Sequence, residues 1–351
     1  MNWPVKVFLV DDSAFMRRLL TAMLEQDGKI KVIGYARNGS EALEKIPVLR
    51  PDVVTMDIEM PEVDGLETLS KLMGLHPVPV IMVSALTTEG AHATLKALEL
   101  GALDFVAKPS NQAEMPLFAA DLCSKVMAIA GVSLKPVGSS KKTARPAVAR
   151  LEKHGYPGKA PVDLVAIGTS TGGPTALRTI ISALPADFPA GILIAQHMPP
   201  GFTRPLAQRL NELSHLRVKE AEEGDLVRPG TALVAPAGWQ TMLSGNCDRL
   251  EVRLTKEAPF PTLFKPSVDV LFLSAAETCG QNTLGVILTG MGSDGVRGMK
   301  GIKEKGGRTL AEAEVSCVVY GMPKAAVEAG VADWVYPLAS MAHEIIKQVK
   351  N

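Results

Sequence analysis

The chain has 351 residues, which is long for a single hydrophobic core, and 46% of them are hydrophobic, so we expect two packed domains. Its 37 lysines and arginines balance 37 aspartates and glutamates, and this balance argues against nucleic acid or a membrane surface as a partner. No apolar run is long enough to span a membrane and the first residues lack a signal-peptide pattern, so we predict a cytoplasmic protein without membrane insertion. The cysteines show no CxxC or metal-binding spacing, and we predict buried thiols in a reducing compartment at Cys123, Cys247, Cys279 and Cys317.

Residues 4–130 are predicted to form the first domain, because strand-like and amphipathic segments alternate there with short connections. The predicted strands are Val5–Val10, Lys31–Tyr35, Val53–Met56, Val80–Val83 and Leu103–Val106. The predicted helices are Ala14–Glu25, Ser40–Val48, Leu66–Met73, Ala91–Leu100 and Glu114–Ala130. This alternation predicts a doubly wound parallel sheet with helices on both faces, in which ligands bind at the carboxyl ends of the strands.

Polar side chains gather where these strands end. Asp11 and Asp12 follow the first strand, and Asp57 follows the third. Ser84 follows the fourth strand and Lys108 the fifth. One such residue alone is more often a helix N-cap or a solvated charge, but matching positions at successive strand ends indicate a single site. Clustered carboxylates repel one another unless a cation lies among them, and Mg²⁺ suits such oxygen ligands. The hydroxyl and the lysine can help to hold a phosphoryl group.

The first domain resembles the response-regulator receiver domains, which have a flavodoxin-like fold. The motifs that carry the resemblance are Asp11-Asp12, MDIEMPEVDG around Asp57, Ser84-Ala85 and Lys108-Pro109. The resemblance implies that Asp57 accepts a phosphoryl group from a sensor histidine kinase. It also implies that Asp12 and Asp57 bind Mg²⁺ directly, with help from Asp11 and the backbone carbonyl of Glu59.

The same resemblance implies a switch that responds to phosphorylation. Ser84 would hydrogen-bond to the phosphoryl group, and Lys108 would pair with it. Phe105 stands where the family has a switch aromatic, although an ordinary core residue of an edge strand is an equal alternative.

Residues 131–160 are predicted to form a linker, because they have no periodicity and are rich in Pro, Gly, Ser and basic residues. The basic residues could also contact nucleic acid or acidic lipid, but no interleaved aromatic residues support that alternative. A short helix near Ala147–Lys153 is the only regular element that we expect there.

The second domain, residues 161–351, opens with an apolar strand at Val162–Ile167, followed by the sequence GTSTGG and a helix that begins near Pro174. Ser170 is therefore expected on a strand-to-helix turn that exposes its hydroxyl. A phosphate-binding loop would need a Lys-Ser/Thr or GxGxxG pattern, which is absent. A plain tight turn and a serine nucleophile remain open, and a nucleophile needs a histidine and a carboxylate from elsewhere.

The rest of this domain again alternates strands and helices. Polar-alternating short strands between residues 217 and 255 are predicted to form an antiparallel insertion. The other predicted strands are Gly191–Gln196, Leu284–Leu288 and Arg308–Glu312. The predicted helices are Thr203–Leu213, Val268–Thr278, one after Asp294 up to Lys305, one from Pro323 and Leu338–Lys350.

Two residues can complete a catalytic group with Ser170. His197 follows a buried strand directly, whereas His215 and His343 lie in polar surroundings where a solvated imidazole is expected. Asp294 lies in a glycine-rich turn after another buried strand. Because parallel strands end at the same edge of a sheet, we predict Ser170 as nucleophile, His197 as general base and Asp294 as the carboxylate that orients the imidazole.

The order Ser, His, Asp along the chain argues against an α/β-hydrolase, in which the histidine comes last. The second domain instead resembles the Rossmann-like catalytic domain of the CheB-type chemotaxis protein-glutamate methylesterases. The motifs that carry this resemblance are GTSTGGPTAL, IAQHMPPGFT, KPSVDVLF, ILTGMGSDG and AEAEVSCVVYGMP. The order of receiver, linker and esterase also matches that family over the whole chain.

The resemblance implies a phosphorylation-activated hydrolase that serves sensory adaptation. Its substrates would be glutamate γ-methyl esters, with release of methanol, and glutamines on the cytoplasmic helices of methyl-accepting chemoreceptors. Backbone N–H groups near Thr171 and Met291 are expected to bind the oxyanion, although Met291 could equally be core packing. The ester chemistry needs no cofactor, and we expect a monomer.

Two other classes of protein remain as alternatives. A non-catalytic adaptor controlled by phosphorylation would act by docking alone and would not need Ser170. A DNA-binding regulator is common among receiver-bearing proteins, but the zero net charge and the absence of a helix-turn-helix pattern argue against it.

Overall fold

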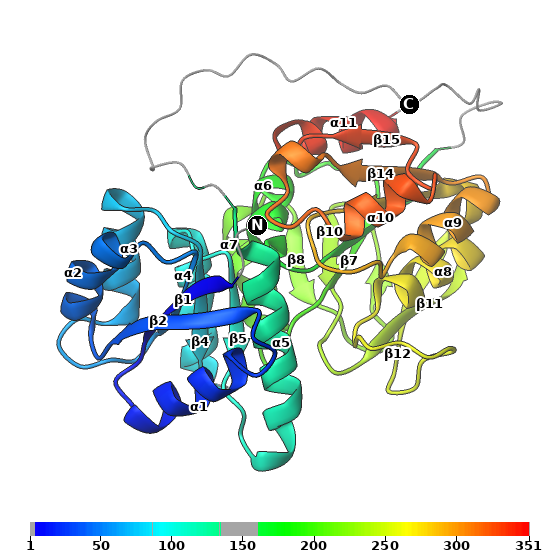
Figure 1. The fold of residues 1–351 in the computed structure, drawn as a ribbon. Helices are drawn as coiled ribbons and strands as arrows, with labels where there is room; N and C mark the ends of the chain where they lie inside the picture. Colours follow the sequence, from blue (N-terminus) through cyan, green and yellow to red (C-terminus); the bar gives the residue numbers. More distant parts are fainter. Residues whose placement is uncertain (1–3, 86, 133, 135–160, 351) are drawn as a thin grey trace. The chain divides into compact units, whose positions relative to one another are not determined.

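The structure is a computed structural model that describes residues 4–85, 87–132, 134 and 161–350. The chain divides into two compact units, Met1–Ala144 and Arg145–Asn351, which are described separately below (Figure 1). Most of the predicted linker, including the helix predicted near Ala147–Lys153, lies outside the described residues.

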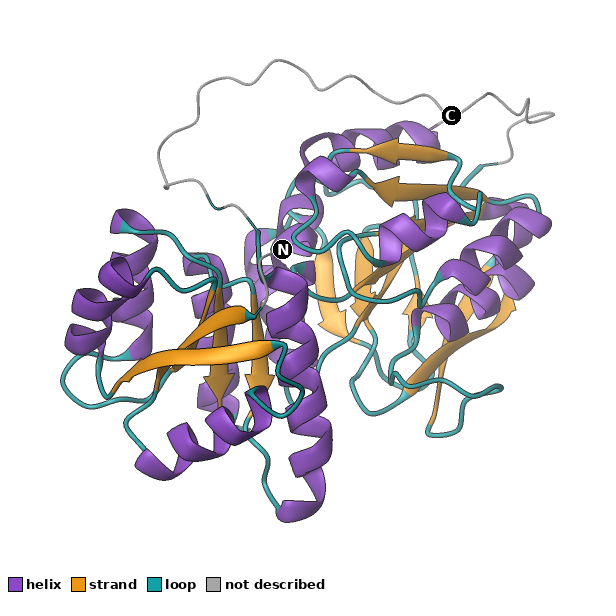
Figure 2. Ribbon diagram, in the orientation of Figure 1, coloured by secondary structure: helices purple, strands orange, loops and turns teal. Residues whose placement is uncertain are grey.

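The first unit is built on a five-stranded parallel sheet with strand order β2-β1-β3-β4-β5. Its strands are β1 (Val5–Val10), β2 (Ile30–Ala36), β3 (Val53–Asp57), β4 (Val80–Ser84) and β5 (Asp104–Ala107). Its helices are α1 (Ala14–Leu24), α2 (Gly39–Leu49), α3 (Gly65–Leu75), α4 (Thr88–Leu100) and α5 (Met115–Ile129), with a 3₁₀ turn at Gln112–Glu114. Helices α1 and α5 pack together, and α2, α3 and α4 pack in series on the other face (Figure 2). The predicted doubly wound fold is confirmed.

Side-chain caps set several helix starts in this unit. Ser13, Asn38, Asp64 and Thr87 each accept a hydrogen bond from a backbone N–H in the first turn of the helix that follows. The cap at Thr87 makes α4 begin at Thr88, three residues before the predicted start, because the Thr87 hydroxyl satisfies the Gly90 N–H. The strand order reverses between β1 and β3, so the residues that follow these two strands share the crevice where such sheets bind ligands.

The second unit is built on a seven-stranded parallel sheet with strand order β15-β14-β13-β6-β7-β10-β8. Its strands are β6 (Leu164–Thr169), β7 (Gly191–Gln196), β8 (Arg217–Glu220), β10 (Thr231–Val234), β13 (Thr283–Ile287), β14 (Arg308–Glu312) and β15 (Trp334–Tyr336). Its helices are α6 (Gly173–Ile181), α7 (Thr203–Leu213), α8 (Val268–Cys279), α9 (Val296–Glu304), α10 (Met322–Glu328) and α11 (Leu338–Lys350), with 3₁₀ turns at Gly280–Asn282 and Glu314–Ser316. Helices α8, α9 and α10 pack in series, and α6 packs against both α7 and α11.

The region between residues 217 and 255 differs from the prediction. Only β9 (Leu226–Val227), β11 (Gln240–Asn246) and β12 (Arg249–Thr255) form the antiparallel sheet. Strands β8 and β10 pair in parallel with each other, and β10 also pairs in parallel with β7. These two strands therefore extend the main sheet. The prediction failed because a short alternating pattern does not distinguish a strand of an insertion from a parallel strand at the edge of the main sheet. Strand β15, which has three residues, was not predicted.

The core of the second unit brings α8 against the central strand β6. Every residue of β6 and β7 is buried. Gly168 lies so close to the Val268 side chain that any side chain at position 168 would clash. Glycine at this position therefore lets the first turn of α8 approach the carboxyl end of β6.

Within the part of the chain that the structure describes, no helix combines the length and the apolar character that a membrane crossing requires.

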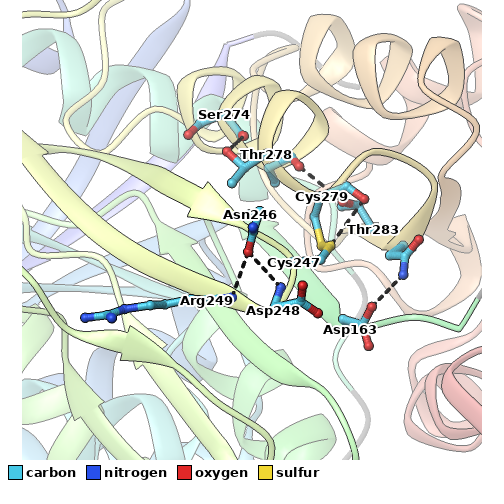
Figure 3. Close-up of a disulfide and its surroundings, with 11 residues drawn as sticks. Asp163, Asn246, Cys247, Asp248, Arg249, Ser274, Thr278, Cys279 and Thr283 are labelled. Atoms are coloured by element: carbon cyan, nitrogen blue, oxygen red, sulfur yellow. Dashed lines mark hydrogen bonds between the residues drawn. A yellow bond between two sulfur atoms is a disulfide. The ribbon is translucent and has the colours of Figure 1, made fainter.

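The prediction of four buried thiols is wrong for one pair. Cys247 and Cys279 form a disulfide, which links the turn between β11 and β12 to the last residue of α8 (Figure 3). Cys123 and Cys317 are free thiols, as predicted, but both are half-buried and not buried. The paired residues are 32 positions apart and belong to no spacing motif, so the pairing depends on the tertiary packing of the hairpin against α8.

Breaking this disulfide is expected to destabilise the second unit by about 3 to 4 kcal/mol, because the bond closes a loop of 32 residues and restricts the unfolded chain. The measurement is urea unfolding of the full chain followed by Trp239 and Trp334 fluorescence, with Cys247→Ser compared with the oxidised and the reduced wild type. The Cys123→Ser variant is the matched control and should keep the wild-type midpoint. Equal midpoints for the oxidised protein and Cys247→Ser would contradict the prediction.

Candidate functional site

Ser170 is held on a turn between a buried strand and a helix. It follows β6 directly, is partly exposed, and its carbonyl accepts a hydrogen bond from the Gly173 N–H at 2.8 Å. Gly172 has a φ of 81°, in the left-handed region that glycine tolerates, and a side chain there would clash with Val318. The glycines after Ser170 are thus required by the turn that presents it.

His197 is placed beside Ser170 by the register of two neighbouring strands. Thr169, the last residue of β6, pairs with Gln196, the last residue of β7, and the His197 N–H donates to the Thr169 carbonyl at 3.0 Å. The Gln196 side-chain amide donates to the carbonyls of Ser170, at 3.0 Å, and His197, at 2.9 Å. Both turns are therefore tied to one buried side chain. His215 and His343 are exposed, as predicted.

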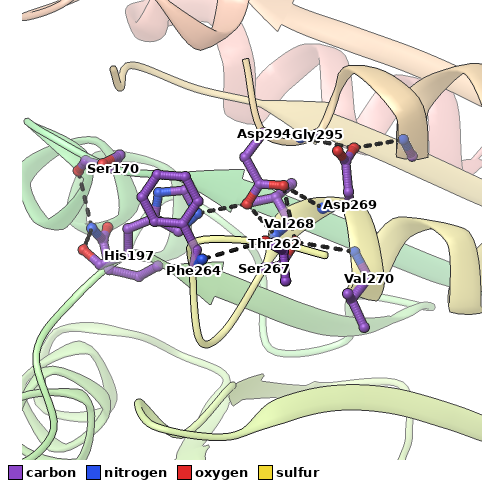
Figure 4. A network of polar contacts seen from close by, with 12 residues as sticks. Ser170, His197, Thr262, Phe264, Ser267, Val268, Asp269, Val270, Asp294 and Gly295 are labelled. Atoms are coloured by element: carbon purple, nitrogen blue, oxygen red, sulfur yellow. Dashed lines mark hydrogen bonds and ion pairs between the residues drawn. The ribbon is translucent and has the colours of Figure 1, made fainter. Parts of the chain in front are cut away.

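Asp294 completes the group from the loop that follows β13. One carboxylate oxygen, Oδ2, lies 2.8 Å from Nε2 of His197. The Ser170 N–H donates to the carbonyl of Thr289 in the same loop at 3.1 Å. Figure 4 shows His197 between Ser170 and Asp294. The structure thus brings together the three residues that the sequence indicated as a catalytic group.

The carboxylate of Asp294 also caps α8. It accepts hydrogen bonds from the Ser267 hydroxyl at 2.9 Å, the Val268 N–H at 2.7 Å and the Asp269 N–H at 3.0 Å. Burial by itself would raise the Asp294 pKa, but the bond to His197 and these N–H groups outweigh burial and lower it below the ordinary value. The positive end of the helix dipole acts in the same direction. Asp294 is therefore held as an anion.

The contact with Asp294 fixes the tautomer of His197. An ionised carboxylate can only accept, so Nε2 carries the proton and Nδ1 is left as the basic atom. Nδ1 is buried and has no hydrogen-bond partner among the described residues. The ring is thus oriented with a free lone pair in the interior of the site.

Asp269, in the first turn of α8, in turn caps the start of α9. Its Oδ1 accepts from the N–H groups of Gly295 at 2.9 Å and Gly298 at 2.7 Å, which lie at the start of α9. Burial raises the Asp269 pKa to about 6. The hydrogen bond from the Gly298 N–H lowers this pKa in part, and the nearby charge of Asp294 raises it further. Two aspartates and two helix N-termini therefore lock the Asp294 loop to α8.

Sequence reasoning missed four residues of this site: Gln240, Phe264, Ser267 and Asp269. The Phe264 ring stacks on the His197 ring, with centroids 3.9 Å apart and planes 6° from parallel. A serine immediately before a predicted helix is an N-cap signature, so Ser267 could have been found. No local pattern indicates Phe264 or Gln240, because their contacts are long-range.

The predicted oxyanion residues lie close to the serine. Thr171 is buried, and its carbonyl accepts from the Thr289 hydroxyl at 2.9 Å. Met291 is half-buried in the Asp294 loop and follows Gly290, where an added side chain would meet Ser170. Glu312 supports this loop by accepting from the Thr289 N–H at 2.9 Å. Both segments are thus near enough to Ser170 to contribute donors.

A second candidate site lies at the strand ends of the first unit. Asp11 and Asp57 are buried and Asp12 is exposed, and one oxygen from each lies within 4.8 Å of the others. Lys108 places its Nζ 2.6 Å from Oδ2 of Asp57. The structure therefore brings four of the predicted residues of this site into one cluster.

The electrostatics of this cluster favour a cation. Burial and then the charge of Asp57 raise the Asp11 pKa to about 6, against the lowering effect of Lys108. Burial also raises the Asp57 pKa, although Lys108 and the backbone N–H groups of Ile58 and Glu59 lower it. Oδ2 of Asp11 is buried and has no hydrogen-bond partner among the described residues. A small divalent cation with oxygen ligands, such as Mg²⁺, would satisfy this orphaned oxygen and the crowded charge.

The remaining predicted residues lie on neighbouring strands. Ser84 is buried, and its Oγ accepts from the Thr94 hydroxyl at 2.8 Å. The Lys108 N–H donates to the Ser84 carbonyl at 2.7 Å, which ties the two strand ends together. Phe105 is buried on the edge strand β5, where Lys125 donates to its carbonyl at 2.7 Å and lies 5.5 Å from its ring centroid. This placement fits a core residue as well as a switch aromatic.

Comparisons with known proteins cover both units. The sequence model of the CheB methylesterase family matches residues 165–345, and that of the response regulator receiver domain matches residues 7–118. A protein-glutamate methylesterase/protein-glutamine glutaminase of Moorella thermoacetica is 46% identical over 99% of both chains. The corresponding protein of Halalkalibacterium halodurans is 47% identical over 100% of both chains. The crystal structure of the Thermotoga maritima CheB methylesterase catalytic domain covers 54% of this chain and 99% of its own, with 43% identity and a TM-score of 0.52.

The opposite pKa shifts of the paired aspartates predict opposite effects of pH on stability. Folded Asp269 binds its proton more tightly than the unfolded chain, so its contribution to stability falls as pH rises from 3.8 to about 6. Folded Asp294 binds its proton less tightly, so its contribution is present above 3.8 and is lost as pH falls through its lower folded pKa.

The measurement is a ¹³C NMR titration of the aspartate carboxyl carbons in the full chain. The Asp269 resonance should titrate near pH 6 and the Asp294 resonance below pH 3.8. Asp269→Asn and Asp294→Asn assign the two signals. A common midpoint for both residues would show that the asymmetry is wrong.

Proposed function

The chain belongs to the CheB methylesterase family and carries that family's receiver domain, and from this premise we propose the reaction, the residues that perform it and their control. The protein is a protein-glutamate methylesterase and protein-glutamine glutaminase that acts on methyl-accepting chemoreceptors in sensory adaptation. The observation that carries the assignment is the placement of His197. It follows β7, the strand paired with the one that Ser170 follows, and its Nε2 lies within hydrogen-bond distance of the buried carboxylate of Asp294. A non-catalytic adaptor would not need this arrangement.

The reaction begins at the Ser170 hydroxyl. Its Oγ attacks the γ-carbonyl carbon of the substrate while Nδ1 of His197 takes the hydroxyl proton. The proton on Nε2 stays in the bond to Asp294, whose negative charge stabilises the imidazolium that forms. Because Nδ1 makes no hydrogen bond with any residue that the structure describes, the Ser170 side chain must turn toward it when the substrate binds.

The tetrahedral intermediate then collapses. The imidazolium returns its proton to the methoxy oxygen, the C–O bond breaks, and methanol leaves from an acyl-enzyme on Ser170. Water, deprotonated by His197, hydrolyses that ester and restores the serine. A glutamine amide follows the same path with ammonia as the leaving group, so one site accounts for both activities. No cofactor takes part in these steps.

The oxyanion of the intermediate needs two donors. We assign them to backbone N–H groups near Thr171 and Met291, because these segments flank Ser170 from the turn before α6 and from the Asp294 loop. The glycines on both sides allow the backbone to approach the substrate closely.

The acidic cluster of the first unit is assigned as the phosphorylation site. Asp57 accepts the phosphoryl group from a histidine kinase, and Asp11, Asp12 and Asp57 would hold Mg²⁺, which would neutralise charge on the phosphoryl oxygens. Lys108, already paired with Asp57, provides the second cation. The crowded carboxylates and the orphaned Oδ2 of Asp11 support this assignment.

Ser84 and Phe105 are assigned as the residues that respond to phosphorylation. Among the described residues, the Ser84 hydroxyl donates at 3.3 Å to the carbonyls of Ala85 and Gly90, which are long contacts. It can therefore turn toward a phosphoryl oxygen at little cost. Phe105 lies on the strand next to Ser84, and the aromatic ring is the element whose packing would change.

The domains are assigned as a receiver at residues 4–130, a linker at 131–160 and an esterase at 161–351, in agreement with family matches at 7–118 and 165–345. We also propose that the protein is a cytoplasmic monomer, since the family's substrates are the cytoplasmic helices of receptors.

The first test is methanol release from methyl-labelled receptor membranes, with and without a small phosphodonor. Wild type should release methanol faster with the phosphodonor, and Ser170→Ala should lose at least about 10³-fold in rate because the nucleophile is gone. If Ser170→Ala kept its activity or its cellular effect, the adaptor hypothesis would replace the esterase.

If phosphorylation of Asp57 controls the esterase, Asp57→Asn should behave differently from Ser170→Ala. This variant should keep the basal rate of methanol release and lose the increase caused by the phosphodonor, because the acceptor oxygen is lost while the triad is intact. Asp52→Asn, which changes a partly exposed carboxylate outside the cluster, is the matched control and should still respond. A phosphodonor response that survives in Asp57→Asn would refute the assignment of Asp57.

A further inference from the structure

We propose that Phe264 is a positioning residue that sets the plane of the His197 imidazole, and that Gln240 holds Phe264 in place. Phe264 lies in the segment between β12 and α8, and its ring lies flat on that of His197, at 3.9 Å between centroids and 6° between planes (Figure 4). The inference rests on the proposed function, in which Nδ1 of His197 is the general base.

The hydrogen bond to Asp294 does not define the imidazole plane by itself. It restrains the position of Nε2, but the ring can still rotate about the Cβ–Cγ bond with little change in the distance from Nε2 to Asp294. A tilt moves the lone pair of Nδ1 away from the Ser170 hydroxyl. A flat aromatic ring in contact with one face opposes this tilt, because any rotation would lose the stacking contact. Phe264 thus supplies the restraint that the hydrogen bond lacks.

Gln240 is the residue that holds this segment. It is fully buried at the start of β11, where Nε2 donates to the Phe264 carbonyl at 2.7 Å and Oε1 accepts from the Ser267 N–H at 2.9 Å. Ser267 in turn donates its hydroxyl to Asp294 at 2.9 Å. One buried amide therefore fixes both contacts of the imidazole, namely the ring on its face and the carboxylate at its edge.

Phe260 provides a matched comparison within the same segment. Its ring lies against the guanidinium group of Arg297, 4.1 Å from the ring centroid to Cζ, and is not the ring that stacks on His197. Replacing Phe260 by leucine removes an aromatic ring from this segment without removing the stack.

The decisive experiment compares Phe264→Leu, Phe264→Tyr and Phe260→Leu in the full chain. For methanol release we expect Phe264→Leu to lower kcat about tenfold with KM unchanged, because only the proton transfer is misaligned. Phe264→Tyr keeps the aromatic face and should restore the rate, and Phe260→Leu should match wild type. A normal kcat in Phe264→Leu, or a change in KM alone, would overturn the proposal, the latter by making Phe264 a substrate contact.

A second readout does not depend on turnover. The stacked ring should shift the ¹H resonances of the His197 ring upfield through its ring current, and this shift should vanish in Phe264→Leu and persist in Phe264→Tyr and Phe260→Leu. If wild type released no methanol while the resonances behaved in this way, the proposed function would fail and the positioning of the imidazole would stand. Unshifted His197 resonances in wild type would overturn the stack itself.

The role of Gln240 is tested by a double-mutant cycle with Gln240→Met, which preserves size and removes both hydrogen bonds. If Gln240 acts through Phe264, the loss of kcat in the double variant should be smaller than the product of the two single losses. Losses that multiply would show that Gln240 acts independently of the stacked ring, and would overturn its assigned role.

Discussion

The second unit depends on the carboxylate of Asp294, which accepts hydrogen bonds from the first turn of a helix and from an imidazole at once. The first turn of α8 has N–H groups without partners inside the helix, and two of them, with the Ser267 hydroxyl, donate to this carboxylate. The bond to Nε2 of His197, together with these N–H donors, lowers the Asp294 pKa despite its burial, so the carboxylate stays ionised. The close approach of α8 to β6 at Gly168 serves this contact, since it brings the helix start to the strand that carries Ser170. Fold and site are thus built by the same hydrogen bonds.

The two units use the same sheet edge for opposite electrostatic purposes. In the second unit, donors surround Asp294 and lower its pKa, and the carboxylate needs nothing more than the imidazole. In the first unit, burial raises the pKa of both Asp11 and Asp57, the charge of Asp57 adds to the effect at Asp11, and Lys108 opposes it at both residues. An anion that is fully satisfied can orient a partner, whereas carboxylates that are crowded and underpaired are prepared to bind a cation or to be modified. The environment, and not the residue type, separates the two roles.

Much of this organisation could be read from the sequence, because strand ends are marked by local patterns. The alternation of apolar and amphipathic segments predicted both parallel sheets, and the residues after the strands predicted which side chains would meet, as Ser170, His197 and Asp294 do. Contacts that depend on packing between distant segments could not be predicted. The Phe264 ring, the Gln240 amide and the Cys247–Cys279 disulfide all come from the hairpin and the segment before α8, whose approach to the sheet no local pattern encodes. For the same reason, β8 and β10 were assigned to the wrong sheet.

The hairpin of β11 and β12 spans from the disulfide to the residues that hold His197 and Asp294, and this has a consequence for how the molecule opens locally. Cys247 lies in its turn, while Gln240 lies at the other end of β11, about 20 Å away for an extended strand of this length. Reduction of this disulfide would release the turn from the end of α8. The buried amide and the cap at Asp294 still hold the opposite ends of the hairpin and of α8. Fraying should therefore begin at the turn and stop before the imidazole, so amide exchange with solvent would be fast near Cys247 and slow at Gln240. The geometry of the Ser170, His197 and Asp294 group is thereby insulated from the redox state of this disulfide.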